Sequence, residues 1–395
     1  MSSNENGTNY QAVRQLVSNS VKAGQGIEEI RHLYSAIFPD ILDQVISDFV
    51  RDMNAVYVLT DPRAIVAAEF QGVGYRWYAG PAEHSLRWKA VLDVMAKSNL
   101  SEQELKKVDQ ASTKVVSLLP SPSLNHFSGR GLVLGYVQSG KTTNFISTIA
   151  KAADEGYRLI IVLSGITNNL RNQTQERLEK SLSGNNPQSW HWLTSAESDF
   201  STTHNAANLL ANPEIRLIAV VKKNKGRLKK LHNWLQTAPD SVRANVPFLL
   251  IDDEADQATV NSAKILDQQT AINLLVTKLL RPSLMPKNAY VGYTATPFAN
   301  ILSDAKNTEQ IYPRDFILPL EKSPNYFGAE ELFGRDPIDE QEQENDLGRN
   351  IIRAVSSSEI SSLGEAARAR SIQAGMLTPD LLNAIKWFLL ATSVR

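Results

Sequence analysis

The spacing of apolar and polar residues changes near residue 123. Before this point, apolar residues recur every three or four positions, as in 41–50 and 105–118, and Ser101 with Glu104 forms a capping-box pattern. After it, short apolar runs alternate with helical stretches. The runs are 131–134, 158–163, 215–221, 248–251 and 289–293. This alternation predicts an α/β fold, with a parallel sheet covered by helices on both faces.

Breaks in these patterns predict three regions. Residues 120–123, Pro-Ser-Pro-Ser, interrupt the helical spacing and are typical of a linker. We therefore predict a helical N-terminal domain over 1–122 and the α/β domain over 123–305. The remainder, 306–395, is expected to be an irregular extension with an acidic loop at 335–346 and an apolar helix from Thr378. That helix favours the start of a further domain of a longer protein, or alternatively a terminal helix docked on the core.

Composition says more about the cellular location of the protein than about its binding partner. The 395 residues include 41 Lys and Arg, 42 Asp and Glu, and no Cys, for a net charge of −1. Nucleic acid would therefore need a local basic surface. The absence of Cys excludes disulfides and thiolate chemistry and fits the cytoplasm. The first ten residues lack a secretory pattern, and the apolar runs are too short to cross a bilayer. We expect a cytoplasmic protein that does not bind a membrane.

Residues 135–142, Gly-Tyr-Val-Gln-Ser-Gly-Lys-Thr, lie between a predicted strand and a predicted helix. They fit the phosphate-loop pattern, in which glycines let backbone N–H groups approach phosphate oxygens at a helix N-terminus. Lys141 would reach the β and γ phosphates, and the Thr142 hydroxyl would bind Mg²⁺. The residues expected to line the nucleotide are Gly135, Gln138, Ser139, Gly140, Lys141, Thr142 and Thr143. The alternative is a glycine-containing turn without a ligand.

A second stretch gives the nucleotide site a chemical role. The apolar run 248–251 ends in Asp252-Asp253-Glu254-Ala255-Asp256. Asp253 at the strand tip would hold Mg²⁺ through a water, and Glu254 would orient and deprotonate the water that attacks the γ-phosphate. The alternative is a solvated acidic turn. A phosphate loop in the same predicted sheet favours ATP hydrolysis, with Lys141 and Glu254 as the catalytic residues.

These motifs resemble those of a known class. Asp-Glu-Ala-Asp at 253–256 and Thr-Ala-Thr at 294–296 resemble motifs of the DEAD-like superfamily-two helicases, in the expected order. Residues 135–142, 165–171, 292–300 and 312–316 more specifically resemble the bacterial Z-one domain family, over roughly 125–335. Its members are described as endonucleases with a helicase-like ATPase core, often near restriction or phage-defence genes. The resemblance implies a RecA-like P-loop NTPase lobe, in which Asp256, Thr294 and Thr296 couple hydrolysis to movement between lobes.

A basic run, 222–230, follows a predicted strand and is the best local feature for nucleic-acid contact. Lys222, Lys223 and Arg227 would hold backbone phosphates without reading sequence. Asn168 and Arg171 carry a weaker expectation of the same kind. The alternative is a solvated basic face. We expect DNA as the partner, together with partner proteins of a defence system.

Two expected components are missing from the motifs. We find no second lobe with an arginine finger, which raises the hydrolysis rate about a thousandfold or more, so hydrolysis by this chain alone should be slow. Asp40, Asp240 and Asp380 each follow a proline but lack the downstream Glu-x-Lys of metal-dependent nucleases. The prediction is an Mg²⁺-dependent, helicase-like ATPase that is the motor or switch part of a DNA-directed phage-defence or restriction-like protein. The alternatives are a nucleotide-gated protein-interaction module with slow hydrolysis, and an endonuclease whose centre is not recognisable.

Overall fold

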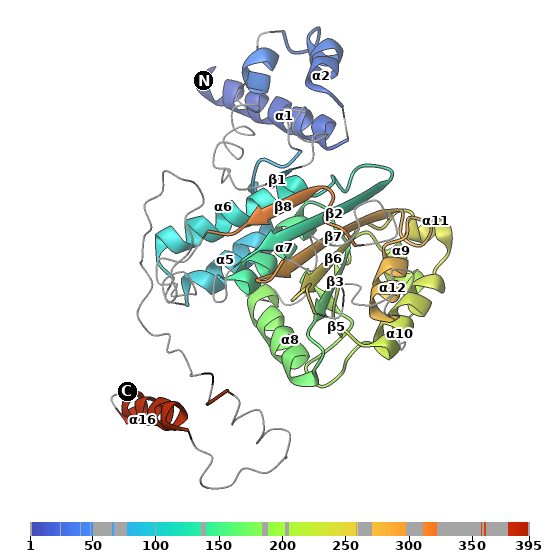
Figure 1. Cartoon of the computed structure of the whole chain (residues 1–395). Coiled ribbons are helices and arrows are strands. Elements are labelled where there is room, and N and C mark those ends of the chain that lie inside the picture. The colour runs from blue at the N-terminus through green and yellow to red at the C-terminus, as the bar shows by residue number, and fades with distance from the viewer. Residues whose placement is uncertain are drawn as a thin grey trace. The chain divides into compact units, whose positions relative to one another are not determined.

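The computed structural model divides into two compact units, Met1–Ser323 and Pro324–Arg395 (Figure 1). The residues that it describes are 2–23, 25–39, 41–47, 49, 65–66, 77–98, 100–135, 140–183, 189–201, 205–257, 259, 271–297, 311–321, 357, 359–360 and 378–393.

The first unit is built on an eight-stranded sheet. Its strands are β1 (Ile65–Val66), β2 (Phe127–Leu134), β3 (Leu159–Ser164), β4 (His191–Trp192), β5 (Leu217–Lys222), β6 (Phe248–Asp253), β7 (Lys287–Thr294) and β8 (Phe316–Pro319). Their order is β1-β8-β2-β7-β6-β3-β5-β4, and every pair is parallel except β1 with β8. The α/β fold with a parallel sheet is confirmed, and each of the five predicted runs is a strand. The short strands β1, β4 and β8 were not predicted.

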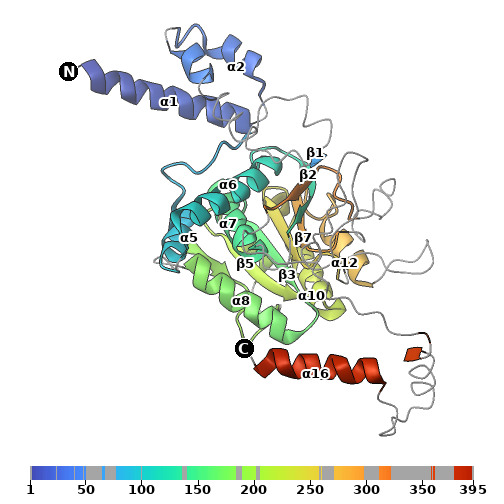
Figure 2. The same ribbon diagram turned by 60° about the vertical axis from the view of Figure 1, so that its left-hand side comes forward.

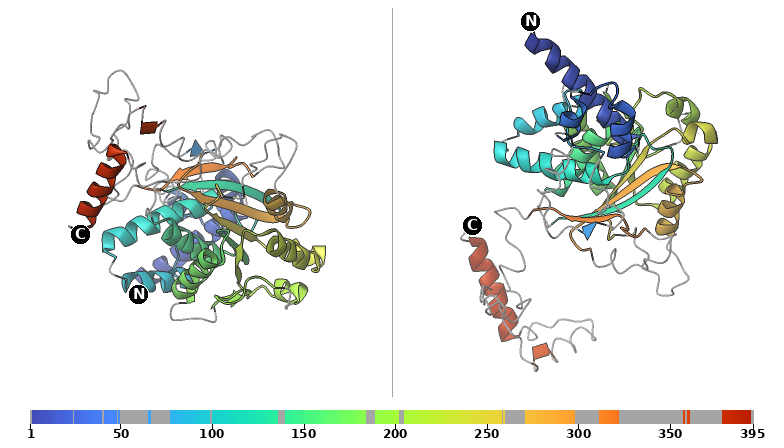
Figure 3. Two further views of the ribbon diagram at one scale, coloured as in Figure 1. Left: turned by 60° about the horizontal axis from the view of Figure 1, so that its bottom comes forward. Right: turned by 90° about the horizontal axis from the view of Figure 1, so that it is seen from above.

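Helices cover both faces of this sheet (Figures 1 and 2). One face carries α5 (Leu86–Ala96), α6 (Glu102–Leu118), α7 (Lys141–Asp154) and α8 (Asn168–Ser183), and the other carries α9 (Ala206–Ala211), α10 (Lys225–Gln236), α11 (Asp240–Arg243) and α12 (Ala271–Leu279). The views in Figure 3 separate the two layers. Strand residues alternate between them: in β3, Ile160 and Val162 join the first core, whereas Leu159 and Ile161 join the second. The near-continuous apolar strands of the sequence therefore reflect burial on both faces.

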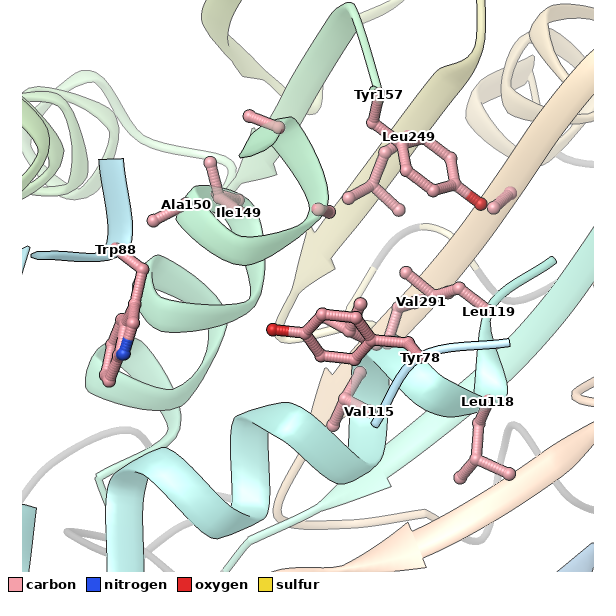
Figure 4. Packing of buried hydrophobic residues seen from close by; sticks show 14 of the residues in the cluster. Tyr78, Trp88, Val115, Leu118, Leu119, Ile149, Ala150, Tyr157, Leu249 and Val291 are labelled. Atoms are coloured by element: carbon pink, nitrogen blue, oxygen red, sulfur yellow. The ribbon is translucent and has the colours of Figure 1, made fainter. Parts of the chain in front are cut away.

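Helices α5 and α6 belong to the same core as the sheet. Figure 4 shows Tyr78 and Val115 packed together with Val291 of β7, all three in one buried cluster. Lys151 of α7 donates to the Asp109 carboxylate of α6 at 2.6 Å, and its ammonium lies 4.2 Å from the centre of the Trp88 ring. The predicted boundary at 122–123 therefore does not divide two cores. The capping box of α6, Ser101 with Glu104, is present as predicted.

The predicted extension at 306–395 is divided between the two units, because residues up to Ser323 belong to the first unit. Strand β8 pairs with β2, which places 316–319 in the sheet of the first unit. Gly131 of β2 allows this contact, because a Cβ at that position would lie 2.1 Å from the Phe316 ring. In the second unit, α16 (Pro379–Ser393) begins with Pro379, as predicted, and exposes large apolar side chains such as Trp387. The predicted acidic loop at 335–346 lies outside the described residues.

Two more helices precede the sheet in the chain, α1 (Ser2–Lys22) and α2 (Ile27–Tyr34). A separate helical N-terminal domain over 1–122 stays a prediction. None of the described helices combines the length and the apolar character needed to span a bilayer.

Candidate nucleotide-binding site

Three predicted site segments meet at the carboxyl edge of the sheet. The registers pair Leu134 of β2 with Thr294 of β7, and Tyr293 of β7 with Asp253 of β6. The Gly135 N–H donates to the Thr294 carbonyl at 3.0 Å, so the phosphate loop starts directly beside the end of β7. Parallel pairing thus brings the start of the loop, the Thr294 segment and the carboxylates together.

The N-terminus of α7 is suited to bind an anion. Gly140, its N-cap, has φ +80°, and no side chain among the described residues caps the helix. No described atom lies within 4 Å of the position that a Cβ at Gly140 would take. Lys141 donates from Nζ to the Gly135 carbonyl at 2.9 Å and so spans the loop, while Thr142 and Thr143 lie half-buried in the first turn. The positive end of the helix dipole and the lysine together favour phosphate. Gln138 and Ser139 lie outside the described residues.

Negative charge gathers opposite this helix end. Burial raises the pKa of Asp253 to about 6, and the neighbouring Glu254 carboxylate adds to this, while Lys223 and Lys141 oppose it. Burial lowers the pKa of Lys141, against the opposing effect of Asp253, Glu254 and Asp256. This agrees with the geometry, because Lys141 donates to the Gly135 carbonyl and the Gly135 N–H donates to Thr294 at the end of β7. Burial destabilises the charged form of this carboxylate, and a bound cation would stabilise it again. Mg²⁺ is suited to this position because it prefers oxygen ligands.

Residues 254–257 form a turn that we call the acid loop. Glu254 lies in the left-handed region at φ +54°, which is unusual for a residue with a side chain. The loop lies against β7, because the Ala255 N–H donates to the Tyr293 carbonyl at 3.0 Å. Gly292 allows this contact, since a Cβ there would lie 2.9 Å from that of Ala255. The backbone conformation that presents Glu254 is therefore fixed from outside the loop.

The structure brings the three predicted coupling residues into direct contact. Thr294 and Thr296 each donate a hydroxyl to the Asp256 carboxylate at 2.7 Å. Burial raises the pKa of Asp256, but the hydrogen bonds from Thr296 and Thr294 outweigh this effect and hold it below its usual value. The carboxylate is thus stabilised in its charged form, and it links the acid loop to the end of β7. A coupling role for these residues remains a prediction.

Lys223, predicted to contact nucleic acid, is placed differently. Its side chain and that of Asp252 are both 0% exposed, and Nζ lies 2.7 Å from the Asp252 carboxylate. Tyr290 donates to the other Asp252 oxygen at 2.8 Å. Lys223 is therefore a buried structural residue, which corrects the sequence prediction. A signal was present: Asp252 lies two residues after Leu250 in β6 and so shares its buried face, where a carboxylate requires a partner.

Arg171 is also withdrawn from solvent. The residue is 2% exposed, and its guanidinium donates to the carbonyls of Val220 at 3.2 Å, Ala196 at 3.0 Å and Ser198 at 3.2 Å. It also donates to the Gln175 side chain at 3.2 Å. With its donors turned inward, this arginine holds the segment after β4 against α8 and is not placed to contact nucleic acid, contrary to the prediction.

The other predicted nucleic-acid residues lie nearer the surface. Lys222, at the end of β5, donates to the Asn168 side chain at the start of α8 over 2.6 Å, in an exposed position. Arg227 is partly exposed, with Nε 3.5 Å from the Asp199 carboxylate. Lys222 and Asn168 therefore meet at the same sheet edge as the acid loop, where the carboxyl ends of β3 and β5 lie. Their contact with nucleic acid stays a prediction.

One connection in the site was not predicted. Tyr293 of β7 donates to the Asn144 side chain of α7 at 2.9 Å, and its ring packs edge-on against Phe145. Burial raises the pKa of Tyr293, so its hydroxyl stays protonated as a donor. This hydrogen bond ties the helix of the phosphate loop to the strand on which the acid loop lies. In the sequence, the only signal was a tyrosine within an apolar strand.

No protein-family model matches the chain, and a search of curated proteins gives no match either. The resemblance to the Z-one domain family therefore stays a prediction from the motifs.

Proposed function

We propose that this chain binds ATP with Mg²⁺ and hydrolyses it at the carboxyl edge of the sheet. One observation carries the proposal: the N-terminus of α7, with Lys141, lies at the same edge of the sheet as the Asp253 and Glu254 carboxylates. A helix end that attracts phosphate and a carboxylate pair with two environments are what NTP hydrolysis requires.

Each residue then has a distinct task. Lys141 would bind the β and γ phosphates, while the first turn of α7, including Thr142 and Thr143, offers N–H groups to phosphate oxygens. The Thr142 hydroxyl and the Asp253 carboxylate fit Mg²⁺, which when bound neutralises charge on the phosphates. Glu254, held in its left-handed turn, would orient the attacking water and take its proton.

The proposed biological role is the motor or switch part of a DNA-directed phage-defence or restriction-like protein. Its support is the contact of Asp256 with Thr294 and Thr296, which joins the carboxylate loop to the end of β7. A second support is the hydrogen-bonded pair of partly exposed Lys222 and exposed Asn168 at the same edge, a suitable place for a phosphate backbone. Within the part of the chain that the structure describes, no three His, Asp or Glu side chains form a group suited to a metal ion.

Lys141→Ala is expected to abolish nucleotide binding. The variant removes the side chain that would bind the phosphates while leaving the fold intact, because Lys141 is only half-buried. In thermal unfolding, Mg·ATP at about a hundred times its Kd should stabilise the unchanged protein by about 2.7 kcal/mol, and the variant hardly at all. Lys180→Ala, at an exposed position of α8, is the matched control and should respond like the unchanged protein. Equal stabilisation of Lys141→Ala would contradict the assignment of the loop.

Added DNA should accelerate ATP turnover if the chain is part of a DNA-directed motor. Turnover is measured with single-stranded DNA, double-stranded DNA and no nucleic acid, at fixed salt, because phosphate contacts weaken steeply with ionic strength. We expect acceleration by at least one form. A turnover rate that neither form of DNA changes would instead favour the nucleotide-gated interaction module. Mg²⁺-dependent cutting that survives Lys141→Ala would favour a nuclease.

A further inference from the structure

Lys223 reaches two parts of the molecule at once. Its ammonium pairs with Asp252 inside β6, and it also donates to the backbone carbonyls of Glu254 at 2.6 Å and Gln257 at 3.1 Å. These carbonyls belong to the first and last residues of the acid loop. The side chain itself comes from the end of β5, two strands away from β6 in the sheet. One buried cation thus joins β5, β6 and both ends of the loop that carries Glu254.

The loop depends on such support. A residue with a side chain at φ +54° is strained and persists only when its surroundings hold it. Within the loop, the Gln257 N–H donates to the Glu254 carbonyl at 2.8 Å, so that carbonyl accepts from both Gln257 and Lys223. A lysine suits this position because an ammonium has three donors and no acceptor. Two of these donors serve the Glu254 and Gln257 carbonyls, while the charge of the ammonium pairs with the Asp252 carboxylate.

We propose that Lys223 is a positioning residue, which holds the acid loop so that Glu254 is presented to the attacking water. The inference rests on the proposed function, in which Glu254 is the base, but it concerns a residue outside the nucleotide site. It also connects the end of β5 with the reaction, because the partly exposed Lys222 immediately precedes buried Lys223. We call the hydrogen bonds from Lys223 to the Glu254 and Gln257 carbonyls the clamp. A ligand that moves the end of β5 would move this clamp and, with it, Glu254.

The alternative is that Lys223 only neutralises Asp252 and stabilises the fold. The two roles can be separated with the double variant Lys223→Met with Asp252→Asn. It removes both buried charges together, so neither is left unpaired, and the amide oxygen can still accept from Tyr290. The clamp on the loop carbonyls is lost in this variant, but the charge balance of the core is kept. Lys180→Met is the matched control on the exposed face of α8.

The first measurement compares Mg·ATP affinity with the single-turnover hydrolysis rate. In the double variant we expect a Kd within about threefold of the unchanged protein and a rate lower by about a hundredfold, the cost of a small misplacement of a catalytic group. On a Glu254→Gln background the double variant should lower the rate no further, because both changes act through one residue. An unchanged rate in the folded double variant, an equal loss of affinity, or a loss that adds to that of Glu254→Gln would overturn the inference.

The second measurement does not need activity. Hydrogen exchange of the Ala255 and Gln257 amides should be at least about tenfold faster in the double variant, whereas amides of β5 and β6 should exchange as before. Unchanged exchange in the acid loop overturns the inference, whatever the enzyme assay shows. Faster exchange in a protein that neither binds nor hydrolyses ATP would support the clamp and refute the proposed function instead.

Discussion

Replacing Glu254 by glutamine is expected to lower the rate of ATP hydrolysis about 10²–10⁴-fold while leaving Mg·ATP binding close to that of the unchanged protein. The amide has the size of the carboxylate and fits the same left-handed turn, but it cannot take a proton from water. Asp253 and Lys141, which would hold the metal and the phosphates, are untouched. Single-turnover hydrolysis and equilibrium nucleotide binding measure the two effects separately.

Glu214→Gln is the control for this variant, because Glu214 is exposed and precedes β5 without touching the site. It should change neither the rate nor the affinity. If Glu254→Gln hydrolyses ATP at the unchanged rate, Glu254 is not the base, and the water must be activated by another group. If it loses affinity to the same extent as rate, the residue acts in binding.

The largest effect on stability is expected from Lys223→Met alone. Removing one member of a buried ion pair leaves the other charge without compensation, which typically lowers the free energy of unfolding by about 3–5 kcal/mol. Here Asp252 would lose its ion pair, and two loop carbonyls would lose a donor. Denaturant unfolding at neutral pH measures the loss. Adding Asp252→Asn to this variant should restore a substantial part of it, since the orphaned charge is then gone.

Lys222→Met is the informative comparison for stability, because it changes the neighbouring residue in the same way. Lys222 lies towards solvent and hydrogen-bonds an exposed Asn168, so its loss should alter the free energy of unfolding by no more than about 0.5 kcal/mol. Adjacent residues at the end of a strand point in opposite directions, which explains the contrast. Similar effects of the two changes would mean that the pair of Lys223 with Asp252 contributes little.

The strands that could be predicted are those whose sequence is an apolar run bounded by turn residues. β2, β3, β5, β6 and β7 each carry such a run, because both faces of the central sheet are buried. β8 has only four residues, Phe316–Pro319, and the last of them is a proline, so nothing in its own sequence marks it as a strand. It joins the sheet because Gly131 of β2 leaves room for the Phe316 ring. That condition involves residues far apart in the chain.

The segment at the predicted domain boundary shows a related limit of local sequence patterns. The Pro-Ser-Pro-Ser segment at 120–123 does end a helix, and local composition suggests a linker. However, a helix can end and its neighbours can still share one core. Tyr157, which follows α7, donates to the Pro120 carbonyl at 2.7 Å, and Trp77 donates to the Leu119 carbonyl. Residues from both sides of the predicted boundary therefore hydrogen-bond this segment. A break in periodicity locates the end of an element but does not say what the element packs against.

The sequence alone determined the chemical inventory of the site: a loop of the phosphate-binding pattern, carboxylates at a strand end, and a Thr-Ala-Thr segment, each placed after a strand. Parallel strands in one sheet then bring these segments to the same edge, which is why the juxtaposition was predictable. Only the tertiary structure decided which charged residues serve the fold. Lys222 and Lys223 are identical in type and adjacent in sequence, yet one lies at the surface and the other pairs with Asp252 in the core. Residue type and spacing describe one segment at a time, whereas burial depends on the neighbours that the fold supplies from elsewhere in the chain.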